Sequence, residues 1–538
     1  MTIKQAGVLV MLFVFFFSNT FTWADTVDSL NTYIKNGEIV FDKEFTAEDD
    51  FKKIQPIDER YNEYMDYTNG FTIHYPNNMF VDVMLSPIKT VLFNKEQTIE
   101  IYYDNFLNKT ASSQAYINYS NRFLENDKDH IKEYEDTHYI NGMKTHILKW
   151  RREKLSRVEN DKNFYVSAEI VKNHHEVYTV FIKSTKPFEK FEDYMTIIKS
   201  FETIEKIGKP QIHHKFKMKN KKLNAETAAF FKKKFLESNQ LMWGIFENSA
   251  PKSFDFLKDI EKRVNYTFDF LVLYQSFSSD GFPMEEMLNA YEHNRYVELT
   301  LQTMYLDGRD NASVTYDILK GKYDQLFYDY AAKIKEFGHP ILFRLNNEMN
   351  GDWCVYSSYY TSKDTEMFKE VWKYVHRIFK ETGVDNVLWV WNPHDGSFPN
   401  FAWNHSLAYY PGDEYVDIVG LTGYNAGTYY PGEKWRGFNE IYVPLYNEYI
   451  NLFEHPFMIT EFGSNSVGGD KIQWIHEMFD NISQFKNIKV AIWWNGIDWD
   501  KNMKPARIYR LDETEEMIRT FDYRLKEFRY DEKPEEQE

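Results

Sequence analysis

Residues 363–391 read KDTEMFKEVWKYVHRIFKETGVDNVLWVW, and this stretch decides the fold. Between Met367 and Phe379 apolar residues recur three or four positions apart, which is the spacing of an amphipathic helix. Thr382-Gly383 is a suitable helix stop. The apolar run 387–391 follows at once and is typical of a strand that is buried on both faces. A helix next to a buried strand is one unit of an alternating α/β fold.

The same alternation extends on both sides of this unit. Eight apolar runs indicate strands between helical stretches, at 241–245, 268–274, 296–303, 340–344, 387–391, 416–420, 457–460 and 489–494. Eight βα units over roughly 300 residues fit a closed (β/α)8 TIM barrel. A doubly wound sheet is the alternative, but no glycine-rich phosphate loop follows the first strand. We therefore predict an α/β fold whose C-terminal part is a (β/α)8 barrel.

The region before the barrel has a different pattern. Short alternating runs such as 71–75 and 177–183 predict half-buried antiparallel strands, and residues 188–201 have the spacing of a helix packed on a sheet. This predicts a smaller α+β domain of unknown role. Residues 206–222 are basic and lack periodicity, which indicates a linker. The predicted boundaries are 1–24 for a signal peptide, 25–205 for the α+β domain, 206–235 for the linker and lead-in helix, 236–530 for the barrel, and 531–538 for an acidic tail.

The N-terminus carries the pattern of a signal peptide. An uncharged apolar run at 6–17 follows Lys4, and the small residues Thr22 and Ala24 take the positions that a signal peptidase reads. We expect cleavage before Asp25. The strongly apolar stretch is shorter than the 18 or more residues that favour a membrane helix, which argues against an uncleaved anchor. The expected protein is therefore secreted or at the cell surface, with no membrane attachment once the signal is removed.

Composition excludes several classes of function. The chain of 538 residues has a formal net charge of −18, which argues against a nucleic-acid partner. Aromatic residues make up 18%, which suits stacking on sugar faces, although filling of the core explains it equally well. The single cysteine, Cys354, forms no intrachain disulfide and is expected to be a buried thiol. Adjacent histidines on a strand point to opposite faces, so the pairs at 174–175 and 213–214 predict no metal site, and no cofactor is expected.

Two glutamates stand at the ends of the fourth and seventh predicted strands. Glu348 follows the run 340–344, and Glu461 follows 457–460. Catalytic residues of such barrels lie at the carboxyl ends of the strands, so we expect both carboxyls at one pocket. One such glutamate alone would more simply form a surface salt bridge. Two carboxyls at one pocket are what glycoside hydrolysis requires, one as the nucleophile and one as the acid/base.

Three motifs at these strand ends resemble those of glycoside hydrolase family 26: FRLNNEMNGDW at 343–353, YVDIVGLTGYN at 415–425 and ITEFGS at 459–464. The resemblance covers about residues 236–505. It implies a retaining enzyme acting on a β-linked polysaccharide such as a mannan, a glucan or an exopolysaccharide, with Glu348 as acid/base and Glu461 as nucleophile. Close contact with Glu461 and partial burial should raise the pKa of Glu348.

The resemblance also implies supporting residues. Tyr424 would hydrogen-bond the nucleophile, Trp353 would line a sugar subsite, and Trp493 or Trp494 would form the floor beneath the reacting sugar. Arg344 would help to keep Glu461 ionised, with a structural pair inside the barrel as the alternative. Asn347 would bind the 2-hydroxyl of the sugar.

The chain departs from the family before its acid. The family commonly has Arg-Pro-x-His-Glu, whereas this chain has Arg344-Leu345-Asn346-Asn347-Glu348. An Asn-Glu pair is typical of the wider clan, so the chemistry is expected to be kept, whereas mannan specificity does not follow. The rival hypothesis is an inactive carbohydrate-binding or scaffold protein on the same barrel, and the presence of both glutamates and Tyr424 argues against it. We expect a monomer whose partner is a polysaccharide or oligosaccharide.

Overall fold

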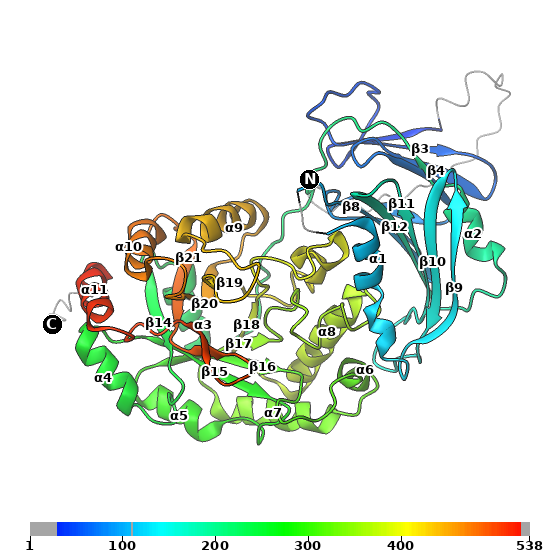
Figure 1. Cartoon of the computed structure of the whole chain (residues 1–538). Helices are drawn as coiled ribbons and strands as arrows, with labels where there is room; N and C mark the ends of the chain where they lie inside the picture. Colours follow the sequence, from blue (N-terminus) through cyan, green and yellow to red (C-terminus); the bar gives the residue numbers. More distant parts are fainter. Residues whose placement is uncertain (1–29, 109–110, 529–538) are drawn as a thin grey trace, which may run out of the picture. The chain divides into compact units, whose positions relative to one another are not determined.

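The computed structural model describes residues 30–108 and 111–528 (Figure 1). The predicted signal peptide, its cleavage site and the predicted acidic tail lie outside the described residues. Within the described ranges, no helix has both the length and the apolar character that crossing a membrane requires.

The chain divides into two compact units. The first consists of Met1–His214 together with two later segments, Ser358–Thr365 and Asn400–Ala408, and the second consists of the remaining residues. The first unit therefore includes part of the stretch that the sequence assigned to the linker, because His213 bonds Asp50 through Nε2 at 2.6 Å. It also includes two segments that the sequence assigned to the barrel.

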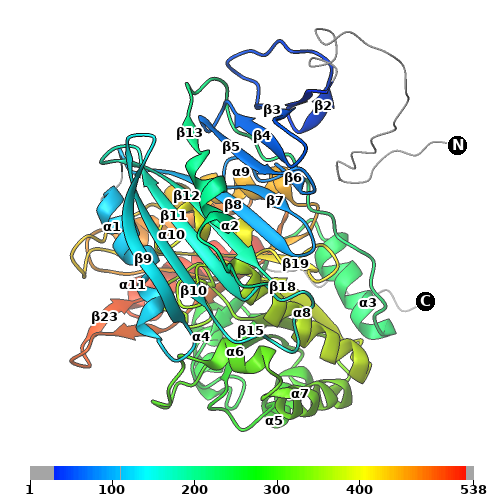
Figure 2. The same cartoon turned by 90° about the vertical axis from the view of Figure 1, so that its right-hand side faces the viewer.

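The first unit contains two antiparallel sheets, as predicted for a sheet-rich α+β domain. The six-stranded sheet has the order β13-β5-β4-β3-β1-β2, and the seven-stranded sheet has the order β6-β7-β8-β12-β11-β10-β9 (Figure 2). The strands are β1 (Thr32–Lys35), β2 (Glu38–Val40), β3 (Phe51–Pro56), β4 (Tyr61–Asp66), β5 (Phe71–Pro76), β6 (Phe80–Asp82), β7 (Thr90–Phe93), β8 (Gln97–Asn105), β9 (Ile131–Ile140), β10 (Met143–Arg151), β11 (Phe164–Val171), β12 (Glu176–Ser184) and β13 (Glu202–Thr203). The helices are α1 (Ser113–Ser120), the 3-10 turn η1 (Arg122–Glu125) and α2 (Glu192–Lys199).

The two sheets and α2 share one apolar core. Ile73 of the first sheet, Val180 of the second and Ile198 of α2 belong to the same cluster, and each is fully buried. The α2 helix lies within the stretch 188–201 where the sequence predicts a helix on a sheet.

The segments Ser358–Thr365 and Asn400–Ala408 are bound into the first unit by buried polar contacts. The Lys363 ammonium lies 2.7 Å from Glu169 Oε1, and both side chains are at most 2% exposed. The indole N–H of Trp403 donates to Ser120 Oγ at 3.0 Å. Because a buried charge without its partner is costly, these contacts fix both segments to the sheet.

The second unit is a closed barrel of eight parallel strands in the order β14 to β21, which confirms the predicted fold. The barrel strands are β14 (Met242–Phe246), β15 (Phe270–Ser276), β16 (Tyr296–Gln302), β17 (Ile341–Leu345), β18 (Val387–Trp391), β19 (Ile418–Asn425), β20 (Phe457–Ser464) and β21 (Ile488–Trp494), and a hairpin of β22 (Ile497–Trp499) and β23 (Pro505–Ile508) follows. Each overlaps one of the eight predicted runs. Both β17 and β18 are buried along their whole length, as a parallel sheet covered by helices requires.

Helices cover the outside of the barrel (Figure 1). They are α4 (Asp255–Val264), α5 (Met284–Glu292), α6 (Val314–Leu319), α7 (Asp324–Phe337), α8 (Thr365–Thr382), α9 (Phe438–Leu452), α10 (Lys471–Ile482), α11 (Glu515–Leu525) and the 3-10 turn η5 (Lys526–Phe528). The helix α3 (Ala225–Phe231) and the π-helical turn η2 (Lys232–Leu236) precede β14 and pack in one cluster with residues inside the barrel. The predicted helix in the opening stretch is α8, and Gly383 ends it with a left-handed φ of 79°. Between β18 and β19, a range described throughout, only the 3-10 turns η3 (Ala402–Asn404) and η4 (Ser406–Tyr409) occur in place of an α-helix.

Candidate active site

The loop after β17 carries Glu348 in a constrained backbone. Asn346 and Glu348 both have a left-handed φ of 53°, which is uncommon for residues other than glycine. The side chain of Asn346 holds this turn by accepting from the Thr303 amide at 2.8 Å and donating to Thr303 Oγ1 at 2.9 Å. The Glu348 amide donates to the carbonyl of Asn392 at 2.8 Å and so ties the loop to the end of β18. Strain of this kind is typical of active sites.

Glu461 lies in β20 and has two supporting side chains. The Tyr424 hydroxyl, from β19, donates to Glu461 Oε2 at 2.7 Å. Nη1 of Arg344, from β17, lies 2.5 Å from Glu461 Oε1. The Glu461 side chain is 7% exposed, and that of Arg344 is fully buried. A buried guanidinium and a hydroxyl donor therefore hold this carboxyl in a fixed direction, which is what a nucleophile needs.

Glu348 lies in a different environment. Its side chain is 15% exposed, and His394 Nε2 lies 3.9 Å from its Oε1. The indole N–H of Trp353 donates to its Oε2 at 3.2 Å. Burial raises the pKa of Glu348 to about 7; the neighbouring His394 opposes this shift, and Glu461 adds to it. One carboxyl is thus held by a cation while the other tends to keep its proton near neutral pH, the division of roles that acid/base catalysis requires.

Several polar residues shape the site around Glu348. The side-chain oxygen of Asn347 accepts from Gln302 Nε2 at 3.1 Å, and the Tyr356 hydroxyl donates to the Asn347 carbonyl at 2.7 Å. Asn350 joins two loops, because its side chain accepts from the His394 amide at 2.9 Å and donates to the His394 carbonyl at 3.0 Å. Gln302, Asn350 and Tyr356 were not predicted from the sequence. Asn350 could have been, because it lies two residues after Glu348 in the same motif.

The aromatic residues divide into exposed and buried sets. Trp353 is 46% exposed and lies against His394 and Phe398, with ring centroids 5.2 and 5.3 Å away. Trp494 stacks on Phe246, with the planes 11° apart. Its edge meets the ring of Tyr424 at 6.2 Å. Trp353 therefore contacts Glu348 directly, whereas Trp494 lies against Tyr424, whose hydroxyl donates to Glu461.

Two of the predicted site residues, Trp493 and Arg344, are fully buried. Trp493 is fully buried, packs against Phe462, and donates its indole N–H to the Tyr509 carbonyl at 2.9 Å, so it cannot be the floor of a sugar site. Neighbouring residues on a strand point to opposite faces, and Trp494 is on the face where it contacts Tyr424. Arg344 is also fully buried, and it contacts Glu461, the carboxyl that the sequence expects it to support, as well as Glu298 inside the barrel.

Cys354 is a buried thiol close to Glu348 in the sequence, as predicted. The thiol is 3% exposed, its Sγ donates to the Asn347 carbonyl at 3.6 Å, and burial raises its pKa well above the ordinary value. A thiol in that state is a poor nucleophile. Among the described residues, no group of three or more His, Cys, Asp or Glu side chains is placed to hold a metal ion.

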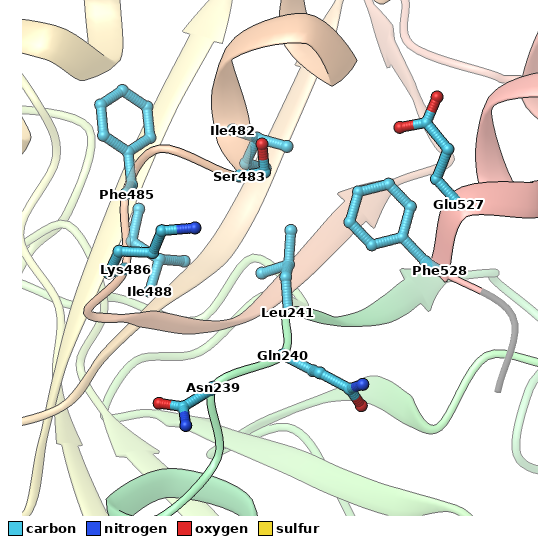
Figure 3. A pocket seen from close by; sticks show the side chains of 10 residues that line it. All are labelled: Asn239, Gln240, Leu241, Ile482, Ser483, Phe485, Lys486, Ile488, Glu527 and Phe528. Carbon is cyan, nitrogen blue, oxygen red and sulfur yellow. The ribbon is translucent and has the colours of Figure 1, made fainter.

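A cavity of about 210 Å³ lies at the other end of the barrel (Figure 3). It is lined by Leu241, which precedes β14, by Ile488 at the start of β21, and by Phe528. These positions are at the N-terminal ends of the strands, whereas Glu348 and Glu461 are at the carboxyl ends. The cavity is therefore separate from the candidate active site.

Comparison with known proteins finds a family match within the barrel. Residues 297–493 match the family model of glycosyl hydrolase family 26. Endoglucanase H of Acetivibrio thermocellus is 32% identical over 201 residues, which cover 36% of this chain and 22% of that protein. A mannan endo-1,4-beta-mannosidase of Bacillus subtilis is 30% identical over 184 residues, which cover 33% of this chain and 44% of that protein. The chain thus spans less than half the length of these curated relatives.

Solved structures with some likeness include a family 26 β-mannanase from Bacteroides ovatus. It is 15% identical, with a TM-score of 0.43, and the match covers 56% of this chain and 92% of that one. The range that matches the family model runs from β16 to β21 and contains both Glu348 and Glu461. The resemblance that the strand-end motifs predict is confirmed, because residues 297–493 of this chain match the family model of glycosyl hydrolase family 26.

Proposed function

We propose that this chain is a secreted retaining β-glycosidase that hydrolyses a β-linked polysaccharide, with a mannan or a glucan as the first substrates to test. The observation that carries the proposal is the unequal support of the two carboxyls. Glu461 has Arg344 and Tyr424 as partners, whereas burial raises the pKa of Glu348 to about 7. The curated relatives named above, an endoglucanase and a mannan endo-1,4-beta-mannosidase, support this substrate class.

In the first half-reaction Glu461 attacks the anomeric carbon and Glu348 gives its proton to the glycosidic oxygen. The bond to the leaving group breaks, and a covalent glycosyl-enzyme forms on Glu461. Tyr424 and Arg344 hold the attacking carboxylate in place. Trp353, which is partly exposed beside Glu348, offers a flat face for the sugar on the leaving-group side.

In the second half-reaction Glu348 is ionised and acts as a base. It takes a proton from water, the water oxygen attacks the anomeric carbon, and the bond to Glu461 breaks, so that Glu461 leaves as a carboxylate. Two displacements at one carbon retain its configuration. A pKa of about 7 suits both tasks of Glu348, since an acid and a base are needed in turn near neutral pH.

The first test is to incubate the purified protein with mannans, β-glucans, xylans and bacterial exopolysaccharides and to measure new reducing ends. The anomer formed first, followed by NMR, reports retention or inversion. No release from any polymer, together with tight binding to one of them, would favour the inactive carbohydrate-binding protein instead.

The two glutamates are then separated by their azide products. Glu461→Ala should lose several powers of ten in rate, each worth about 1.4 kcal/mol of barrier, and azide should yield the inverted α-glycosyl azide. Glu348→Ala should accumulate the glycosyl-enzyme from an aryl glycoside with a good leaving group, and azide should release a β-glycosyl azide. Exchanged product configurations would show that the two roles are reversed. Two variants as active as the wild type would reject the assignment.

A further inference from the structure

A third carboxyl contacts the machinery of the nucleophile and has no part in the mechanism above. Glu298 lies in β16, and its side chain is fully buried. One of its oxygens forms an ion pair with Nε of Arg344. The same guanidinium contacts Glu461 Oε1 through Nη1 at 2.5 Å. A single cation therefore bridges two carboxyls that come from different strands.

The position of Glu298 follows from the register of the barrel. Arg344 of β17 pairs with Thr300 of β16, and Glu298 lies two residues earlier on the same face of β16. Nε of Arg344 also donates to Thr300 Oγ1 at 2.7 Å, and Nη1 donates to Asn392 Oδ1 at 3.0 Å. Glu298 and Thr300 on one side and Asn392 on the other therefore fix the direction in which the guanidinium meets Glu461.

The charges around Glu298 do not balance if every carboxyl is ionised. The charged or titratable groups that face it are Arg344 from β17, Glu461 from β20 and the Tyr274 hydroxyl from β15. Among these described groups Arg344 is the only cation. Two largely buried carboxylates cannot share one guanidinium cheaply, because one negative charge remains uncompensated.

Of the two carboxyls, Glu298 is the one in the position to hold a proton. It is fully buried, whereas Glu461 keeps some exposure at the mouth of the barrel and has the Tyr424 hydroxyl as a donor. Burial raises the pKa of Glu298 to about 8; Arg344 opposes this shift, and Glu461 adds to it.

We propose that Glu298 is a positioning residue that works as an uncharged carboxylic acid, fixing the guanidinium of Arg344 while leaving its positive charge to Glu461. An ionised Glu298 would compete for the same cation and would repel the charge of the nucleophile. The proposal rests on the proposed function, because the nucleophile belongs to that mechanism.

The test compares Glu298→Gln with Glu298→Ala. Glutamine has the shape of the protonated acid and no charge, so E298Q should keep kcat/KM at pH 6 within about threefold of wild type. E298A removes one of the side chains that hold Arg344 and should lose roughly a hundredfold. Above pH 8 the wild-type rate should fall more steeply than that of E298Q, because only the wild type has this carboxyl to ionise. Glu261→Gln is the matched control, since Glu261 is a buried carboxyl paired with Arg295 at 2.9 Å.

An infrared difference spectrum between wild type and E298Q reads the charge directly. At pH 6 it should show the carbonyl band of a protonated carboxylic acid, and at pH 10 that band should be replaced by carboxylate bands. Carboxylate bands at pH 6 in an active enzyme, or E298Q as impaired as E298A, would overturn this inference alone. A wild-type protein that cleaves no glycoside would overturn the proposed function and the positioning role with it.

Discussion

Replacing Trp353 with phenylalanine should raise the pH at which activity is lost on the alkaline side. The indole N–H of Trp353 donates to Glu348 Oε2 at 3.2 Å. A donor of this kind stabilises the carboxylate more than the neutral acid, so it lowers the pKa of Glu348. Phenylalanine keeps an aromatic ring beside Phe398 and removes only the donor.

The size of the shift follows from the geometry. A hydrogen bond to a charged group contributes about 1.5–3 kcal/mol. Because Trp353 is 46% exposed, solvent screening reduces the loss to about 1 kcal/mol. One pKa unit corresponds to about 1.4 kcal/mol, so the pKa of Glu348 should rise by about 0.7 unit from its value of about 7. Protonated Glu348 is the active form in the first half-reaction, so a higher pKa extends activity to higher pH.

The assay is kcat/KM for a soluble glycoside as a function of pH, measured for wild type, W353F and W499F. W499F is the control, because Trp499 is exposed to a similar extent, 51%, and its indole does not contact Glu348. W499F should therefore keep the alkaline pKa of the wild type. An alkaline pKa that falls or stays the same in W353F would show that the indole N–H does not stabilise the Glu348 carboxylate. A uniform loss of rate with no shift would mean that Trp353 acts through ring contact alone.

Two further predictions concern the whole chain. Activity should survive EDTA, because no metal cluster occurs among the described residues; turnover abolished by chelator with the fold intact would contradict this. The fragment 206–538 holds the predicted linker and barrel. It should melt at least several degrees below the full chain, because Lys363 and Trp403 lose Glu169 and Ser120. Equal melting temperatures measured by calorimetry would show that those contacts are dispensable.

The barrel could be predicted because its signals are local. The apolar spacing that predicts α8 and the continuous apolar run of β18 lie within one stretch of sequence, and neither depends on a distant partner. The same holds for the two glutamates, since a residue that follows a strand is recognised from the strand itself.

The features that could not be predicted depend on residues that are far apart in the sequence. Both faces of β21 are covered, so hydrophobicity could not decide whether Trp493 or Trp494 faces the site. The ion pair of Glu298 with Arg344 depends on the register of β16 against β17, which a single sequence does not reveal. The contact of Lys363 with Glu169 joins positions 194 residues apart.

The two segments that complete the first unit have a consequence for synthesis of the chain. The unit begins near the N-terminus, yet its last segment, Asn400–Ala408, lies beyond five strands of the barrel. A ribosome must therefore translate through residue 408 before every part of this unit exists. Until then the apolar surface around Trp150, which packs in one cluster with Phe401 and Trp403, has no covering from this segment. Although the first unit is the first to be translated, it cannot be completed until most of the barrel has been made.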